Sequence, residues 1–268
     1  MELFFCALLL VFWFQETCCT QCGPLPSSSF PDSPTDVVGA LPPDQRSSKL
    51  RRLFLEARRS ARRPIRFTQL PAVVNNGSAV ETTNEEEVVA LRQNLDHQQK
   101  ENAIAHELSH IVLQSKGFAA MVHTPDNTPP LMKELGFVIT SCVDDAVVDR
   151  RMSRRGFKPE LLNHDTAEQM RLHPPTYPAN YFDNPIVKDG NALLIVCFSF
   201  RKRYRGDEIE PSWQKLSTDV VARAHILASQ IGGIGFDDAR TCLGRKKYIR
   251  DVLGYPITFC NPLTGEYE

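Results

Sequence analysis

The segment AIAHELSHIV, residues 103–112, contains two histidines four positions apart, His106 and His110, with a glutamate directly after the first. The surrounding residues are apolar and free of proline, so they favour a helix, and Gly117 offers a stop signal soon after. Positions i and i+4 of a helix lie on one face, so both imidazoles can reach the same metal ion. Glu107 then projects beside that ion, where a carboxylate can take a proton from water.

This H-E-x-x-H pattern resembles the metal-binding core of the zincins, a clan of zinc metallopeptidases. Residues 105–110, AHELSH, are similar to the ImmA/IrrE-like peptidases, and the resemblance covers residues 101–156. It implies an α+β, mostly helical fold: a zincin-like catalytic core with a small N-terminal sheet and a C-terminal helical annex. It also implies one Zn2+ per chain, bound by His106 and His110, with Glu107 as the general base. The alternative is an amphipathic helix whose histidines bind no metal.

A zinc site of this kind needs a third protein ligand. Metzincins have a glycine and a histidine where this chain has Leu113 and Lys116, so that subgroup is excluded. Gluzincins take an acidic ligand from a second helix, and such a helix is predicted from the prolines at 129–130 to Arg155, with Gly156 as its cap.

Within this second helix Asp145 and Asp149 stand four positions apart, the gluzincin spacing with aspartate in place of the first glutamate. We expect Asp145 to bind zinc and Asp149 to accept a hydrogen bond from the far nitrogen of a ligand histidine. Asp144 and Glu134 remain alternative ligands, and a solvated acidic face paired with arginines is the alternative to any metal role. Aspartate is one methylene shorter than glutamate, so the two helices must approach more closely.

The resemblance implies hydrolysis of a peptide or protein substrate, because zinc with three protein ligands keeps one position open for water and the scissile carbonyl. Zincins add a side chain that stabilises the oxyanion, and the candidates in the loop after the second helix are His173, Tyr177 and Tyr181. The alternative function is a catalytically silent, zincin-fold binding or regulatory protein. Its partner contact would be a basic amphipathic helix from Ser47 or Ser48 to Arg63.

Composition agrees with a globular enzyme. A length of 268 residues with 42% apolar content can bury a full core, and a net charge of −1 points to no nucleic-acid partner. The cysteines at 142, 197, 242 and 260 are compatible with two disulfides or with buried thiols, and Cys142 is expected to be a core residue rather than a bridge.

The N-terminus is a separate segment. Residues 3–14 form an apolar run that fits a signal-peptide core, so residues 1–22 are a possible signal peptide or membrane anchor. Residues 23–46, rich in proline and serine, are predicted to be a linker or pro-segment, and residues 47–268 the peptidase domain. Membrane contact is expected only through the N-terminus. The protein is predicted to be secreted or anchored, or cytoplasmic if the start codon is misassigned.

Further elements are predicted around the motif. A strand is expected at 65–70, and either it or residues 71–80 could form the sheet edge that holds the substrate. Residues 82–91 are expected to be helical and to lead into the motif helix. Three more helices are expected at 191–205, 213–230 and 237–253.

Overall fold

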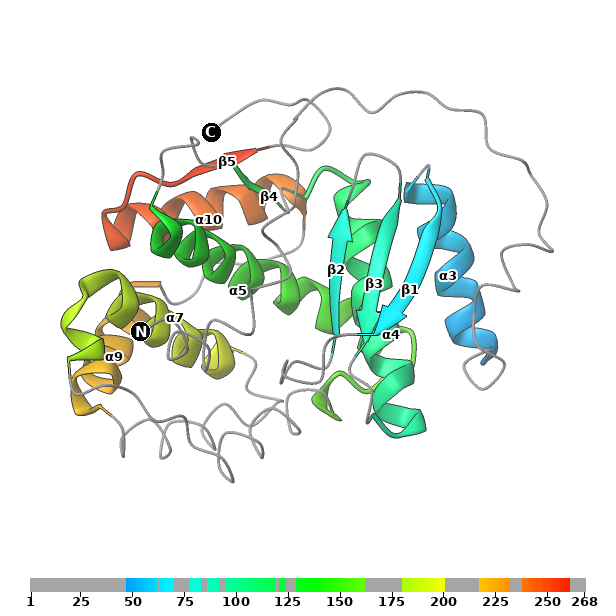
Figure 1. The fold of residues 1–268 in the computed structure, drawn as a ribbon, viewed down its shortest axis with the longest axis horizontal. Helices are drawn as coiled ribbons and strands as arrows, with labels where there is room; N and C mark the ends of the chain where they lie inside the picture. The colour runs from blue at the N-terminus through cyan, green and yellow to red at the C-terminus, as the bar shows by residue number, and fades with distance from the viewer. Residues whose placement is uncertain are drawn as a thin grey trace.

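The fold is α+β and mostly helical, with a small sheet near the N-terminal end of the described chain and a helical C-terminal part (Figure 1). The predicted fold class is therefore confirmed. The computed structural model describes residues 47–61, 63–69, 78–82, 86–91, 95–118, 121–123, 129–161, 180–200, 217–231 and 238–260. The elements are α3 (Ser48–Ala61), β1 (Ile65–Gln69), β2 (Ser78–Thr82), β3 (Glu87–Leu91), α4 (His97–Gln114), β4 (Met121–His123), α5 (Pro130–Arg154), η3 (Tyr181–Asp183), α7 (Pro185–Phe200), α9 (Thr218–Ile231), α10 (Ala239–Leu253) and β5 (Thr258–Cys260).

The first three strands form one mixed sheet in the order β1-β3-β2. Strand β1 runs parallel to β3, and β2 runs antiparallel to it, so that Val89 lies between Phe67 and Val80. The prediction of a helix over residues 82–91 was wrong for the described part of that segment, in which Thr82 ends β2 and residues 87–91 form β3. All five residues of β3 are buried, and its β-branched valines suit a central strand. The acidic Glu87, which looked like a helix start, instead forms an ion pair with Arg63 at 3.5 Å.

Helix α4 carries the H-E-x-x-H motif and packs against both α3 and the strands β2 and β3 (Figure 1). Its start is fixed by a capping box, in which the Asp96 carboxylate accepts from the Gln99 backbone and the Gln99 side chain accepts from the Asp96 backbone. Gly117, at φ 84°, terminates the turn after the helix. Helix α3 buries the apolar stripe that was predicted for it.

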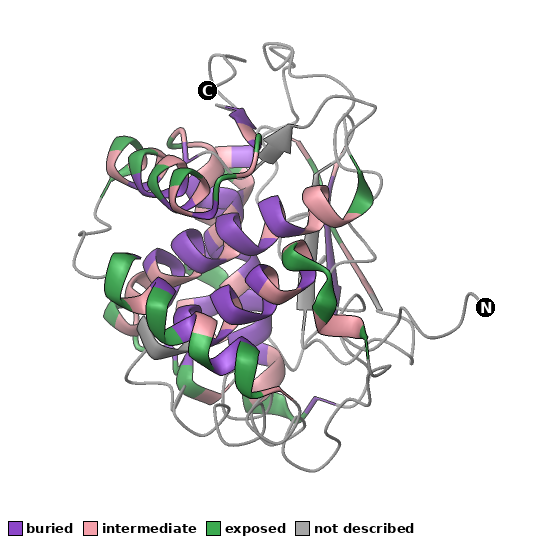
Figure 2. Ribbon diagram, turned by 90° about the vertical axis from the view of Figure 1, so that its left-hand side faces the viewer, coloured by how far each residue is buried: buried purple, intermediate pink, exposed green. Residues whose placement is uncertain are grey.

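Helix α5 is the centre of the helical part, because α4, α7, α10 and β4 all contact it. It begins at Pro130 and ends at Arg154, and Gly156 follows with φ 77°, as the sequence indicated. Figure 2 shows buried residues concentrated on the inner faces of these helices. The motif helix and the predicted acidic helix are therefore direct neighbours.

The C-terminal helices α7, α9 and α10 correspond to the three predicted ones, although α7 begins six residues earlier than expected. A short antiparallel pair, β4 with β5, was not predicted.

Cys142 lies in the core, as expected, but the expectation that it forms no bridge was wrong. Cys142 on α5 forms a disulfide with Cys197 on α7, which ties these helices together. Cys260 is also disulfide-bonded, whereas Cys242 is a free, buried thiol. Burial, followed by the charge of Asp144, raises the pKa of the Cys242 thiol to about 12.

No helix in the described ranges is long and apolar enough to cross a membrane. The apolar run at residues 3–14 and the segment up to residue 46 lie outside those ranges, and the division into domains stays a prediction.

Candidate metal site

Three donor atoms from two helices converge at one point. His106 and His110 lie one turn apart on α4, and their Nε2 atoms are 3.1 Å from each other. Asp145 reaches them from α5: its Oδ1 lies 3.1 Å from His110 Nε2 and 3.6 Å from His106 Nε2. These are the two histidines and the aspartate that the sequence singled out, and together they form a candidate metal-binding group.

The spacing of the three atoms fits a tetrahedral ion. Bonds of about 2.0–2.1 Å at tetrahedral angles place ligand atoms about 3.3–3.4 Å apart. The observed separations of 3.1, 3.1 and 3.6 Å bracket that value. The three side chains are only 15–20% exposed, so an ion held there would be partly shielded from water while one side stays accessible. The aspartate is short, but α4 and α5 pack closely enough for it to reach.

Asp149 lies behind the first histidine. Its Oδ1 is 3.8 Å from His106 Nδ1, and that nitrogen is buried without a hydrogen-bond partner. A small rotation of the ring or of the carboxylate would close this gap into a hydrogen bond, which would fix Nε2 as the metal-binding nitrogen. The geometry is thus compatible with the orienting role expected for Asp149, which remains a prediction.

Asp144 does not join the cluster. Consecutive residues on a helix point about 100° apart, so Asp144 faces α10 while Asp145 faces α4. Its Oδ2 accepts a hydrogen bond from the ammonium group of Lys246 at 2.7 Å, and both side chains are at most 3% exposed. This contact removes Asp144 as a candidate ligand. The sequence does not predict this ion pair, because Lys246 stands in the basic run 245–247, a pattern typical of a solvated helix face.

Glu107 follows the first donor histidine on α4 and is 5% exposed. The helix places it in the same turn as His106, and its role as a general base stays a prediction. Its backbone position is therefore fixed by the same capped helix that fixes the histidines.

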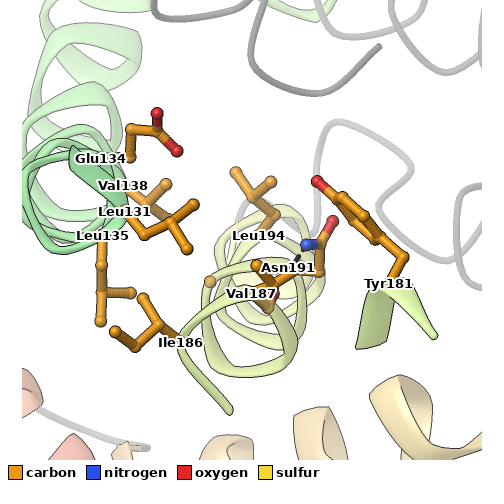
Figure 3. A pocket seen from close by; sticks show the side chains of 10 residues that line it. Leu131, Glu134, Leu135, Val138, Tyr181, Ile186, Val187, Asn191 and Leu194 are labelled. Carbon is orange, nitrogen blue, oxygen red and sulfur yellow. Dashed lines mark hydrogen bonds between the residues drawn. The ribbon is translucent and has the colours of Figure 1, made fainter. Parts of the chain in front are cut away.

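The structure places two of the remaining candidates, Tyr181 and Glu134, away from the donor cluster. Tyr181 begins η3 and lines a pocket with Glu134, on the N-terminal half of α5, and not the donor cluster (Figure 3). Glu134 stands eleven residues before Asp145, about 16 Å along the helix axis, so it is not the third ligand. Burial, and then the charge of Glu134, raise the pKa of the Tyr181 hydroxyl. His173 and Tyr177 lie outside the described residues, and the oxyanion roles of all three candidates stay predictions.

Comparison with known families agrees with this geometry. Residues 61–133 match the family model Peptidase_M78, described as the IrrE N-terminal-like domain. The match spans the three-stranded sheet and α4 and ends in the first turn of α5, before Asp145. No curated protein matches the chain, and no solved structure matches it either. Over residues 61–133 the chain therefore resembles the IrrE-type peptidases, a zinc-metallopeptidase-like domain, and Asp145 adds an acidic third donor beyond the matched segment.

Proposed function

We propose that the protein is a zinc-dependent peptidase that hydrolyses peptide bonds. The observation that carries the proposal is the triangle of His106, His110 and Asp145 donor atoms at tetrahedral spacing. Helix α4, which provides the two histidines, also carries Glu107. Two imidazoles with one carboxylate form a donor set typical of catalytic zinc, which keeps a position open for substrate.

The residues of the site would have different roles. His106, His110 and Asp145 would hold the ion, and Asp149 would orient the His106 ring. Bound zinc supplies Lewis-acid chemistry, activating water and polarising the scissile carbonyl. Glu107 accepts the proton of the attacking water and then delivers it to the leaving amine.

An edge strand offers the main-chain contacts that an extended substrate needs. Among the described residues, β2 pairs with β3 on one side only, and it contacts α4. A peptide could add to β2 as a further strand, with its backbone hydrogen bonds matching the ladder. Residues 78–82 overlap the second of the two segments that the sequence suggested for this role.

The disulfides support an oxidising compartment, because such bonds rarely persist in the cytosol. One disulfide joins Cys142 to Cys197, and Cys260 takes part in another disulfide. We accordingly propose that the protein lies outside the cytosol, secreted or anchored through its N-terminus.

The decisive experiment compares wild type with Glu107→Gln in metal content and in hydrolysis of a mixed peptide library. We expect both proteins to bind one zinc per chain and only wild type to cleave peptides, because glutamine keeps the shape but cannot take the proton. Hydrolysis by the variant at the wild-type rate would contradict the role of Glu107. Absence of bound zinc in both proteins would contradict the peptidase proposal as a whole.

A second candidate function is a binding or regulatory protein without turnover. The observation that favours it is the exposure of Arg51, Arg52 and Arg59 on α3, which leaves a basic surface free for an acidic partner. Neutralising these three arginines would abolish partner binding under this function and leave peptide hydrolysis unchanged under the first.

A further inference from the structure

A pocket lies between the N-terminal half of α5, the helix α7 and η3 (Figure 3). The pocket opens to solvent, and its cavity volume is about 50 Å³, room for roughly three to five water-sized groups at about 10–15 Å³ each. Aliphatic side chains form most of its walls, among them Leu131 and Val138 from α5 and Val187 and Leu194 from α7. Such walls suit the methylene stem of a long side chain.

The polar groups of the pocket are mainly hydrogen-bond acceptors. Asn191 is 5% exposed, and its amide nitrogen donates to the Val187 carbonyl at 2.7 Å. Its Oδ1 atom is buried and has no hydrogen-bond partner, and it points towards the side of the pocket where the Tyr181 hydroxyl lies (Figure 3). A buried acceptor without a donor is costly, so a ligand that supplies an N–H would stabilise it.

Glu134 adds a negative charge on the opposite side of the pocket from Tyr181 (Figure 3). None of the described residues that line the pocket is cationic. An apolar pocket with a carboxylate and an unsatisfied amide oxygen is complementary to an aliphatic stem that ends in a cation with several donors. Lysine and arginine side chains have that form.

A partly exposed stripe on α5 connects the pocket with the donor cluster. Glu134, Phe137, Ser141 and Asp145 follow one another at helical spacing, and none of them is fully buried. The eleven residues from Glu134 to Asp145 span about 16 Å of helix. An extended peptide advances about 3.3–3.6 Å per residue, so roughly four or five substrate residues cover that distance.

We propose that this pocket is a specificity subsite that binds a lysine or arginine side chain of the substrate, roughly four or five residues from the scissile bond. That the bound side chain belongs to a substrate rests on the proposed peptidase function. That Glu134 and Asn191 recognise a basic side chain rests on the pocket alone.

The first test uses small probes and needs no hydrolysis. The dissociation constants of n-butylammonium and n-butylguanidinium, with n-butanol as the uncharged reference, are measured by NMR titration on wild type and on Glu134→Gln. We expect the variant to bind both cations at least about 5-fold more weakly and to bind n-butanol equally, a loss of about 1 kcal/mol for the cations. The matched control is Glu160→Gln, which removes an exposed carboxylate just beyond α5 and should leave all three constants unchanged.

A second variant narrows the same pocket. A Cβ added at Gly190 would lie 3.8 Å from Leu135 Cδ1, an ordinary contact, so Gly190→Ala fits without moving the backbone. We expect it to weaken all three probes, because it removes space and not charge. Failure of the cations to bind wild type, or equal binding by Glu134→Gln, would overturn the proposal.

The second test reads the cleavage pattern of a peptide library. Wild type should prefer lysine or arginine at one position, Glu134→Gln should lose that preference, and Glu134→Lys should shift it to acidic residues. A cleavage pattern without any basic preference would overturn the subsite. If wild type binds the cations but cleaves nothing, the peptidase function fails and the recognition of a basic side chain stands.

Discussion

The ammonium group of Lys246 on α10 lies 2.7 Å from Oδ2 of Asp144 on α5, with both side chains withdrawn from solvent. Asp144 immediately precedes Asp145, the aspartate that meets the two motif histidines. The ion pair therefore joins α10 to α5 at the residue next to the candidate metal donor, and it fixes which of the two neighbouring aspartates faces the histidines.

Replacing Lys246 with methionine should destabilise the protein by about 3–5 kcal/mol, because it leaves the Asp144 carboxylate buried without its partner charge. Urea denaturation of wild type and variant measures the difference. The double variant Asp144→Leu, Lys246→Met should recover most of the loss, since it removes both charges together. A single variant as stable as wild type would show that the two groups do not pair.

Replacing Asp145 with alanine should lower zinc affinity by more than about 100-fold, because a lost ligand costs more than the 10–100-fold typical of a lost supporting contact. Competition with a chromophoric chelator measures the affinity. Asp144→Asn is the matched comparison: it should cost stability through Lys246 yet keep one zinc per chain. The opposite result, with zinc lost only from Asp144→Asn, would reassign the ligand.

Replacing Cys142 and Cys197 with serine should destabilise the protein by about 4 kcal/mol in the chain-entropy model, since the disulfide closes a loop with a sequence separation of 55. Thermal unfolding of the variant and of wild type, the latter with and without a reductant, measures the effect. Wild type under reducing conditions should unfold at or below the temperature of the variant, because the reductant also breaks the bond of Cys260. Unchanged unfolding temperatures would indicate that the bond contributes nothing to stability.

Glu56 should give a pH-dependent contribution to stability. Burial alone would raise its pKa, but the hydrogen bonds and charges of Arg155 and Arg151 outweigh burial and lower it. A carboxyl whose pKa is lowered on folding stabilises the protein above its unfolded value near 4.5, and this contribution is lost as the pH falls through the folded value.

At pH 7 we therefore expect Glu56→Gln to cost about 0.5–1 kcal/mol, the usual scale for a partly exposed pair. At pH 3 the cost should shrink, which urea denaturation at the two pH values would show. A constant difference between pH 3 and pH 7 would contradict a role for the ion pairs with Arg151 and Arg155.

Local sequence rules determined the motif helix and the acidic helix. The capping residues before α4, the apolar run around His106 and His110, and the glycines after each helix act within a few residues of the chain. For the same reason, the spacing of the two histidines and of the two aspartates was enough to predict that each pair lies on one face of its helix. The apolar stripe of α3 and the strand β1 followed from periodicity in the same way.

Contacts between distant segments were decided only by tertiary structure. Residues 87–91 were predicted to be helical because glutamates precede them. Burial between β1 and β2 instead makes them the central strand. The spacing to Asp149 favoured Asp145 and left Asp144 as an alternative, and only the packing of α10, through Lys246, showed that Asp144 faces away from the histidines. The Cys142–Cys197 bond likewise depends on α5 lying against α7. Side-chain chemistry is local, whereas the choice of partner is set by how whole helices pack.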